Sequence, residues 1–372
     1  MKKCVLGLVF MSMIVMLVSC GSESTPAPVT GWVIGATTDA VTHVPTVKIL
    51  KTVNGGASWV LQALPAECAG FGGNDISAVT DQVAWAALGD FQNVDGGILH
   101  TADGGTTWTL QTLPDGMMNR HIKGIKGVSP TEAWAVSLRG DVLHTTDGGN
   151  HWVIVEMKNA DGQIIPVQQV NRMDVTGKDI WIVDSLAKNL GVIHSPDGGA
   201  TWWQEQLLDI GEGSGPLSIS AYDSLVAWAG VNSEGYLWGT TNGGRSWIKS
   251  SDTISGTADF DDICASSANV VWVAQNNGLT SGGVAARITV TNGTFASNIF
   301  TDVNYMMEGV SPLRDNQTAW LVGFKTLFAA AELPHGAIYY TDNGGVTWQL
   351  QNLPDNARDI DFWKVSFVGA RR

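Results

Sequence analysis

The sequence predicts an all-β fold: a seven-bladed β-propeller of four-stranded blades whose first blade is closed by the C-terminal strand. Three observations support this prediction. A short phrase ending in tryptophan recurs along the chain, a second tryptophan motif recurs between its copies, and an apolar strand without a successor follows the last copy. Glycine accounts for 44 of the 372 residues and only 15% of residues are charged, which favours tight turns over helices or disorder.

The recurring phrase reads Thr-Ala-Asp-Gly-Gly-Thr-Thr-Trp at 101–108 and repeats with small changes. A seventh copy, at 289–295, is one residue short and ends in Phe295. The final aromatics of the first and last copies are 289 residues apart over six intervals, about 48 residues per repeat, a period typical of four-stranded propeller blades. The six full copies occupy 52–59, 101–108, 145–152, 195–202, 240–247 and 341–348.

Each copy has the chemistry of a hairpin turn. Glycine reaches positive φ without steric cost, and an Asp or Asn before it bonds the backbone amides that follow. The tryptophan opens the next strand and can cover the turn with its ring. The pattern resembles the Asp-box, or BNR, repeat, in which the box is a structural hairpin on the rim away from the usual binding face. Calcium binding is the alternative, although one carboxylate per loop is a poor oxygen cage. The box residues are Asn54, Asp103, Asp147, Asp197, Asn242 and Asn343, with Trp59, Trp108, Trp152, Trp202, Trp247 and Trp348.

A second motif places a tryptophan among small apolar residues before each box. One repeat therefore reads as an inner strand, a tryptophan strand, a strand into the box and a strand out of it. The chain enters on a tryptophan strand, so the first blade lacks an inner strand, and 360–368 can supply it. Such strand sharing protects the sheet edges of a closed ring. The seven tryptophans are Trp32, Trp85, Trp134, Trp181, Trp228, Trp272 and Trp320.

The N-terminus has the features of an export signal. Lys2 and Lys3 precede an apolar run from 5 to 18 that is too short for a comfortable membrane span. The run ends Leu-Val-Ser-Cys, which resembles the lipobox of bacterial lipoproteins with Cys20 as the acylated residue; an ordinary signal peptide is the alternative. Residues 1–20 are then the signal peptide, 21–30 a polar tether of at most about 30–35 Å, and 31–372 the propeller. Gly21 after the cysteine favours the outer membrane, if the cell has one, and several acyl chains anchor firmly.

Charge and cysteine content exclude several classes of function. The formal net charge is −14, and no basic stripe offsets phosphate charge, which disfavours nucleic acid as a partner. Cys68 and Cys264 fall about four blades apart, too far for a disulfide. The spacings typical of zinc sites and c-type haem are absent from the sequence, so we expect no metal and no cofactor.

The predicted propeller has two unlike rims. The boxes share one rim (the box rim) with the turns between inner and tryptophan strands. The opposite rim (the loop rim) carries the connections between blades, which vary in length and composition. Loops on a rigid scaffold commonly carry binding sites, so we place a site on the loop rim and near the central channel. Its candidate residues are Met117, Met118, Arg120, His121, Arg172, Asp261, Tyr305, Met306 and Arg358.

Each of these candidates has a structural alternative. Arg120, Arg172 and Arg358 can line the channel mouth and receive carboxylates bidentately, or each can pair with a local Asp. Asp261 belongs to a run of acids that is either a solvated loop or a calcium site. Met306 is either loop packing or an adaptable docking residue.

The boxes interleaved with Ala-Trp-x-Val strands resemble the propeller family of the photosystem II stability and assembly factor. That resemblance implies a non-enzymatic scaffold that binds a protein client, in this case in the cell envelope, and we expect a monomer. The alternative is a carbohydrate-binding protein or a glycosidase, because sialidases and xyloglucanases also carry Asp-boxes. Sialidases need a three-arginine clamp and a Tyr nucleophile assisted by Glu, and the Phe/Tyr-Arg-Ile-Pro motif is missing. Hydrolysis by two carboxylates needs a pair about 5–10 Å apart, which a sequence cannot place.

Overall fold

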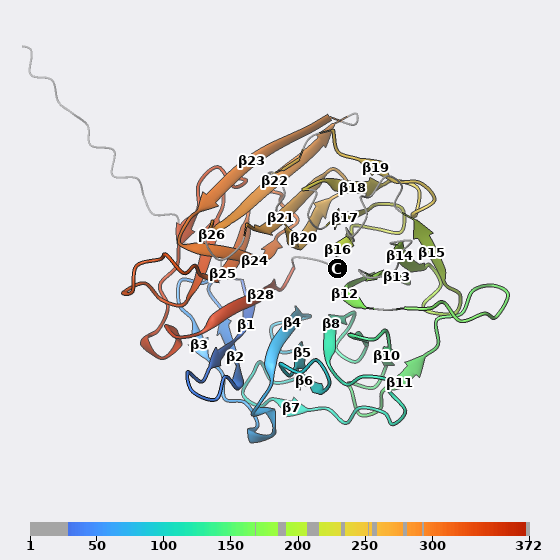
Figure 1. The fold of residues 1–372 in the computed structure, drawn as a ribbon, viewed down its shortest axis with the longest axis horizontal. Coiled ribbons are helices and arrows are strands. Elements are labelled where there is room, and N and C mark those ends of the chain that lie inside the picture. The colour runs from blue at the N-terminus through green and yellow to red at the C-terminus, as the bar shows by residue number, and fades with distance from the viewer. Residues whose placement is uncertain are drawn as a thin grey trace, which may run out of the picture.

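The computed structural model describes residues 29–167, 169–184, 191–206, 216–231, 235–251, 253–254, 259–277, 281–291 and 294–369. The described strands form seven four-stranded antiparallel sheets around a central channel, as predicted (Figure 1). The predicted signal peptide, Cys20 and most of the tether lie outside the described residues. Within these ranges no helix is long and apolar enough to cross a membrane.

In every blade the inner strand lines the channel and the other three follow outward. Blade 1 contains β28 (Asp361–Phe367), β1 (Gly31–Thr38), β2 (Pro45–Thr52) and β3 (Val60–Leu61). Blade 2 contains β4 (Gly72–Ala78), β5 (Ala84–Gly89), β6 (Gly96–Thr101) and β7 (Thr109–Leu110). Blade 3 contains β8 (Ile122–Gly127), β9 (Ala133–Ser137), β10 (Val142–Thr145) and β11 (Val153–Val155). Blade 4 contains β12 (Val170–Thr176), β13 (Asp179–Asp184), β14 (Gly191–Ser195) and β15 (Trp203–Gln206).

The remaining three blades follow the same order. Blade 5 contains β16 (Pro216–Ala221), β17 (Ala227–Val231), β18 (Leu237–Thr240) and β19 (Ile248–Lys249). Blade 6 contains β20 (Asp259–Ser267), β21 (Val270–Asn276), β22 (Gly283–Thr291) and β23 (Thr294–Asp302). Blade 7 contains β24 (Tyr305–Pro312), β25 (Ala319–Lys325), β26 (Gly336–Thr341) and β27 (Gln349–Leu350). Two short 3-10 helices, Ala66–Cys68 and Asp355–Ala357, lie in connections between blades.

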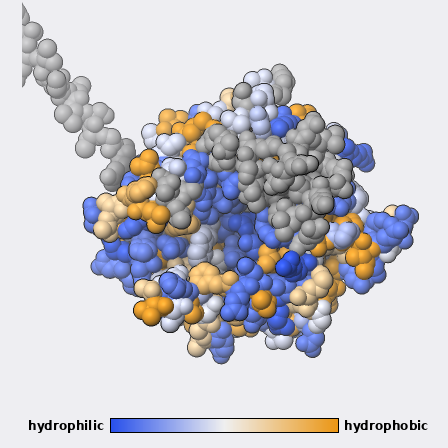
Figure 2. All heavy atoms as spheres, in the orientation of Figure 1, coloured by the Kyte–Doolittle hydropathy of each residue, from blue (hydrophilic) through white to orange (hydrophobic). Residues whose placement is uncertain are grey.

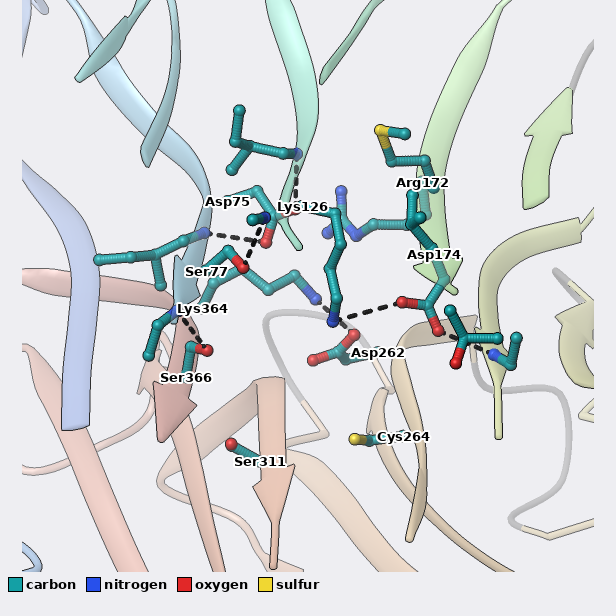
Figure 3. Close-up of a pocket in the computed structure, with 18 of the residues that line it drawn as sticks. Asp75, Ser77, Lys126, Arg172, Asp174, Asp262, Cys264, Ser311, Lys364 and Ser366 are labelled. Atoms are coloured by element: carbon teal, nitrogen blue, oxygen red, sulfur yellow. Dashed lines mark hydrogen bonds and ion pairs between the residues drawn. The ribbon is translucent and has the colours of Figure 1, made fainter. Parts of the chain in front are cut away.

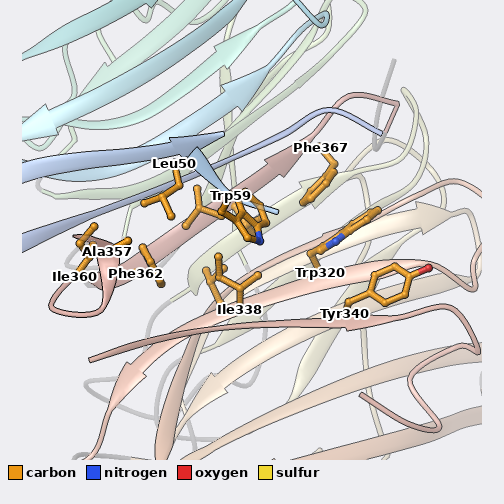
Figure 4. Packing of buried hydrophobic residues seen from close by; sticks show 12 residues of the cluster. Leu50, Trp59, Trp320, Ile338, Tyr340, Ala357, Ile360, Phe362 and Phe367 are labelled. Carbon is orange, nitrogen blue, oxygen red and sulfur yellow. The ribbon is translucent and has the colours of Figure 1, made fainter. Parts of the chain in front are cut away.

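The C-terminal strand closes the ring, as the sequence predicts. β28 pairs antiparallel with β1 from Gly31↔Phe367 to Ala36↔Asp361. The ring of Phe367 stacks on Trp320 of blade 7 with centroids 3.5 Å apart and meets Trp59 of blade 1 edge-on. These residues belong to the apolar cluster that joins the last blade to the first (Figure 4). The two ends of the propeller are therefore joined by both backbone pairing and aromatic packing.

The six boxes form the predicted hairpins and satisfy their own polar groups. In the second box, Thr101 Oγ1 donates to Asp103 Oδ1 at 3.0 Å and accepts from the Gly105 N–H at 2.8 Å. The Thr107 N–H donates to the same Asp103 oxygen at 2.9 Å. Where the box carries asparagine, as at Asn54, the Oδ1 atom accepts the equivalent bonds from Thr52 and Ser58. Asp and Asn thus accept equivalent hydrogen bonds at this position of the hairpin.

Five of the seven box aromatics pack edge-on against the tryptophan of the preceding blade. Trp108 meets Trp32 with centroids 5.4 Å apart and an interplanar angle of 88°. The short seventh copy keeps this contact, because Phe295 meets Trp228 at 6.3 Å and 86°. Its strand pairing differs from that of the boxes. The ladder between β22 and β23 runs without interruption to Thr291↔Thr294, so only two residues separate the paired strand ends.

The described residues separate into the two predicted rims. On the box rim, a box glycine donates its N–H to the turn between the inner and tryptophan strands, as Gly104 does to Gln82 at 2.8 Å and Gly148 to Thr131 at 2.9 Å. On the loop rim, the connections bond to each other instead; for example, the Arg120 N–H donates to the Val94 carbonyl at 3.1 Å. The inner strands therefore begin at the loop rim and end at the box rim.

Candidate binding site at the channel and the loop rim

The central channel contains a cavity of about 380 Å³ that is lined by the inner strands of all seven blades. In the space-filling view, the centre of the ring is hollowed and hydrophilic (Figure 2). Charged side chains from five blades converge there (Figure 3). Lys126 Nζ of β8 lies 3.3 Å from Asp174 Oδ1 of β12, and Lys364 Nζ of β28 lies 3.0 Å from Asp262 Oδ1 of β20. The channel is thus lined by paired charges.

Many of the polar groups in the channel connect neighbouring blades. Asp174 Oδ2 of blade 4 accepts a hydrogen bond from the Ala221 N–H of blade 5 at 2.8 Å, and Asp262 Oδ2 of blade 6 accepts one from the Val310 N–H of blade 7 at 3.0 Å. Hydroxyl groups do the same at other junctions. These carboxylates are therefore part of the framework of the ring. The further acceptor–donor pairs are Asp75–Ile125, Ser77–Gly127, Ser218–Ile263, Ser220–Ala265, Ser311–Phe367 and Ser366–Ala78.

Two cations cross the channel to the same backbone carbonyl, that of Asp261 in blade 6. Lys364 Nζ of blade 1 donates to it at 2.9 Å, and Arg172 Nη2 of blade 4 donates to it at 3.4 Å. Lys364 Nζ also donates to the Glu308 carbonyl of blade 7 at 3.1 Å. Neither blade 1 nor blade 4 is a neighbour of blade 6. Arg172, Asp261 and Lys364 thus form a hub that links blades lying apart in the ring.

Four ionisable groups lie at the loop-rim end of this hub: Lys123, Arg172, Asp261 and Glu308, which we call the mouth cluster. Burial raises the pKa of Asp261 to about 7, although Lys364 and Arg172 oppose the shift. Burial and the nearby Asp261 raise the pKa of Glu308 well above its usual value. Burial, reinforced by Arg172, lowers the pKa of Lys123 to about 8. Arg172 Nε and Asp261 Oδ2 are buried and have no hydrogen-bond partner among the described residues.

Two of the predicted site residues, Arg172 and Asp261, are therefore brought together, although they are 89 positions apart in the sequence. The two other arginines of the prediction bond elsewhere. Arg120 lies 3.9 Å from Asp95, and Arg358 donates to the Glu332 carbonyl at 3.3 Å. The three arginines consequently do not form one clamp at the channel mouth, because each is held by a different element of the fold.

Met118 and Arg120 are exposed on the loop that connects blades 2 and 3. The side chain of Met118 is 72% exposed, and the facing loop contributes Phe91 and Val94 at 59% and 60%. The two loops are locked together, since Asn119 Nδ2 donates to the Asn93 carbonyl at 2.8 Å and the Arg120 N–H donates to the Val94 carbonyl. We call Phe91, Val94 and Met118 the loop-rim patch.

Three other predicted site residues lie beneath the rim. His121, Tyr305 and Met306 are 4%, 2% and 2% exposed, and Met117 packs partly buried against the apolar cluster between blades 2 and 3. The structure therefore places these four side chains below the surface of the rim, and for Met306 it agrees with the packing alternative. For Tyr305 and Met306 the reason is that β24 begins at Tyr305, so a segment predicted as loop is the start of an inner strand.

Several residues of the channel and the rim were not predicted, among them Phe91, Val94, Lys123 and Lys364. A weak signal was present for Lys364, a single cation inside the apolar C-terminal strand. Lys123 offered no signal of its own, because its role depends on inner strands of other blades.

The structure also places the cysteines and tests for a metal centre. Cys68 and Cys264 are buried and free. The described residues contain no group of three or more His, Cys, Asp or Glu side chains placed to hold a metal ion. The chemistry available at the channel is therefore that of the mouth cluster and the paired charges below it.

Comparison with known families and sequences agrees with this architecture. Residues 115–273 match the model of a family described as photosynthesis system II assembly factor YCF48. The matched segment runs from the loop that carries Met118 into blade 6, and it includes Arg172 and Asp261. No curated protein sequence matches the chain.

Solved structures with similar folds include YCF48 bound to D1 peptide, at 18% identity and a TM-score of 0.54, covering 75% of this chain and 80% of that one. YCF48 from Cyanidioschyzon merolae is 14% identical with a TM-score of 0.57, covering 86% and 97%. A GH74 xyloglucanase from Xanthomonas campestris is 11% identical with a TM-score of 0.51, covering 88% and 68%. These likenesses establish the fold: a BNR-type β-propeller that resembles YCF48.

Proposed function

We propose that this protein is a non-enzymatic scaffold that binds a polypeptide client at its loop rim, in the manner of an assembly factor. The observation that carries the proposal is the contrast between the rims. The six full boxes satisfy their own polar groups in the same way, as at Asp103 and Asn54. The loop rim instead presents an apolar patch and, at the channel, buried charged atoms that have no partner among the described residues. The match of residues 115–273 to the YCF48 family model also supports a scaffold function.

The loop-rim patch is suited to binding because its loops are already ordered. Asp90 Oδ1 accepts the Val94 N–H at 2.9 Å and shapes the first loop. Both oxygens of the buried Asp141 accept N–H groups of the second loop, from Met118 at 3.0 Å and Asn119 at 3.1 Å. A surface that is ordered before binding loses little conformational entropy on association. Exposed apolar side chains held in this way are typical of an interaction site.

The mouth cluster offers a second contact for the same client. Within the described part of the chain, Arg172 Nε and Asp261 Oδ2 are buried polar atoms without a hydrogen-bond partner. A client carbonyl or carboxylate can accept from the guanidinium, and such charge-assisted bonds are stronger than neutral ones. The loop-rim patch would supply affinity through apolar contact. The mouth cluster would fix the orientation of the client through hydrogen bonds.

Asp261 and Glu308 are also the residues that would favour a glycosidase. Both carboxyl groups have raised pKa values, as a general acid requires, with burial as the main cause. Asp75, Asp174 and Asp262, by contrast, accept backbone N–H groups of neighbouring blades and serve the framework. A hydrolase on this fold would therefore depend on Asp261 and Glu308, which makes that alternative testable with a single substitution.

We further propose that acylation of Cys20 anchors the protein in the bacterial cell envelope, in the outer membrane where one exists. The lipobox-like Leu-Val-Ser-Cys sequence supports this proposal. The propeller would then act outside the cytoplasm as a monomer, close to membrane-bound clients.

The scaffold proposal is tested by capture from solubilised envelope of the native organism. Purified mature protein is immobilised, and bound proteins are compared between wild type and the double variant Phe91→Ser, Met118→Ser. We expect a specific client to be reduced at least tenfold by the double variant. The matched control replaces exposed apolar residues of the box rim, Leu225→Ser and Val346→Ser, which are 55% and 68% exposed. The control should retain the client.

Equal recovery by all three proteins would contradict a role for the loop-rim patch. Turnover of fluorogenic glucan or sialoside substrates that is abolished by Asp261→Asn would replace the scaffold proposal with the glycosidase alternative.

A further inference from the structure

The outer strand of blade 6 differs from the other six. β23 is nine residues long, whereas the outer strands of the other blades have two to four. It pairs with β22 in continuous register from Thr291↔Thr294 to Gly283↔Asp302, without a bulge. Figure 1 shows this pair running along the outside of the ring. Blade 6 thus ends in a long, regular strand where its neighbours end in short ones.

The free edge of β23 is available for pairing. The strand is last in its sheet, and no described strand besides β22 pairs with it. Along its outer edge, backbone N–H and C=O groups alternate toward solvent, an arrangement that templates the addition of another strand. Proteins usually block such edges with Lys, Pro, a bulge or a short strand. β23 contains no proline, and its one charged residue is Asp302 at the end of the strand, which accepts a hydrogen bond from the Tyr339 hydroxyl.

β23 is also held rigidly against the ring. Phe295 packs on Trp228 of blade 5, and Phe300 packs on Tyr339 and Trp348 of blade 7. Asn298 Nδ2 donates to the Gly344 carbonyl in the box of blade 7 at 2.9 Å. Because the strand is fixed on both faces, its edge is already extended and straight. Little ordering is left to oppose the binding of an incoming segment.

The exposed side chains indicate what would bind. Ile299 lies midway along the strand and is 51% exposed, on the same face as Phe295. β19, the outer strand of the adjacent blade 5, is only two residues long. An added strand would place an apolar side chain beside Ile299. The net charge of −14 opposes a second copy of this chain and favours a segment that is neutral or basic.

We propose that the outer edge of β23 binds an extended segment of a partner polypeptide as a fifth, antiparallel strand of blade 6. The segment is neutral or basic and carries an apolar residue opposite Ile299. Main-chain hydrogen bonds give affinity in such strand addition, and the alternate side chains give specificity. This site lies on the outside of the ring and does not depend on the loop-rim client of the proposed function.

The test uses a fluorescent peptide with the sequence of β22, GVAARITVT, flanked by two lysines at each end. This sequence is chosen because it is the natural neighbour of β23. Binding to the mature protein is followed by fluorescence anisotropy. A matched peptide has alternate backbone amides N-methylated, which removes main-chain donors and keeps the side chains. We expect saturable one-to-one binding of the first peptide and at least tenfold weaker binding of the second.

Two variants place the site on the protein. Ile299→Lys and Ser297→Lys introduce the kind of charge that normally guards an edge, and each should weaken peptide binding at least tenfold. The matched control is Ile248→Lys on β19, where the residue is 61% exposed, and it should bind as wild type does. Equal binding of the N-methylated peptide, or an equal loss in the control, would overturn the proposal. So would a dimer in light scattering that Ile299→Lys dissociates, since a second copy would then occupy the edge.

Discussion

At the scale of single residues, Asp261 combines two roles that normally exclude each other. Its backbone carbonyl receives Lys364 and Arg172 and so contributes to the hub. Its side chain has a buried oxygen without a partner among the described residues. Burial disfavours the charged form, which explains why the pKa of Asp261 rises to about 7 although Lys364 and Arg172 oppose the shift. The backbone carbonyl of Asp261 therefore stabilises the fold, whereas burial of its ionised side chain destabilises it.

The different roles of the Asp261 backbone and side chain predict how Asp261→Asn changes the stability of the protein. A carboxyl group whose pKa is raised on folding contributes stability that is present at low pH and is lost as the pH rises through the folded value. The wild type should therefore lose stability between about pH 4 and pH 7. Asparagine cannot ionise, so the variant should be more stable at pH 7.5, by on the order of 2 kcal/mol, with a smaller difference at pH 4.5.

Urea denaturation of wild type and variant at these two pH values measures the difference. Glu308 shifts in the same direction and remains in the variant, so the pH dependence should become weaker without vanishing. Asp115→Asn, at an exposed loop position, serves as the control. A variant less stable than wild type at pH 7.5 would show that the ionised Asp261 side chain supports the hub.

Individual site residues were hard to predict because their contacts depend on the positions of other blades. Arg172 and Asp261 could be selected as polar residues near the loop rim, but their meeting depends on how blades 4 and 6 face across the channel. Tyr305 and Met306 were misplaced because the loop between β23 and β24 is only two residues long, so the inner strand starts earlier than its composition suggests.

At the scale of elements, the sequence was informative because turn chemistry is local. The Gly-Gly pair, the preceding Asp or Asn and the following Trp specify each box without reference to the rest of the chain. The seventh copy shows the same logic, since one residue fewer leaves only two residues between the paired strand ends while Phe295 keeps the aromatic contact. The unusual length of β23 was not predicted, because its residues after Phe295 lack strict alternation.

The closing strand β28 gives a prediction at this scale. Phe367 is 2% exposed and lies between Trp320 and Trp59 at the junction of the last and first blades. Phe367→Ala removes that contact and leaves a cavity, which costs about 3–5 kcal/mol in a packed core. Thermal and urea denaturation measure the loss. The exposed Val346→Ala should change stability by less than about 0.5 kcal/mol, and a similarly small effect of Phe367→Ala would mean that β28 does not hold the ring closed.

At the scale of the whole molecule, repetition explains both what could be predicted and what could not. Seven tryptophan strands and a period of about 48 residues predict the number of blades and the closure. The repeats specify a rigid body but carry no information about a ligand. The loop-rim patch and the edge of β23 both arise where one blade departs from the others, and such departures cannot be interpreted before the blades are placed in space.

The cellular position of the protein gives the last prediction. Cys20→Ala removes the residue proposed to be acylated, so the protein should leave the membrane fraction or accumulate as the uncleaved precursor. Cell fractionation and mass spectrometry of the N-terminus distinguish these outcomes, and Ser19→Ala is the matched control. Unchanged membrane retention of a correctly processed Cys20→Ala protein would contradict the lipid anchor.

The hub has a consequence for how the ring comes apart. In a repeat array held only by contacts between adjacent units, one unit can fray while the rest persists. In this ring, Lys364 of blade 1 and Arg172 of blade 4 both donate hydrogen bonds across the channel to the Asp261 carbonyl of blade 6. Local melting of any of these three blades also breaks a tie to a distant one. Denaturation should accordingly proceed as a single event instead of blade by blade.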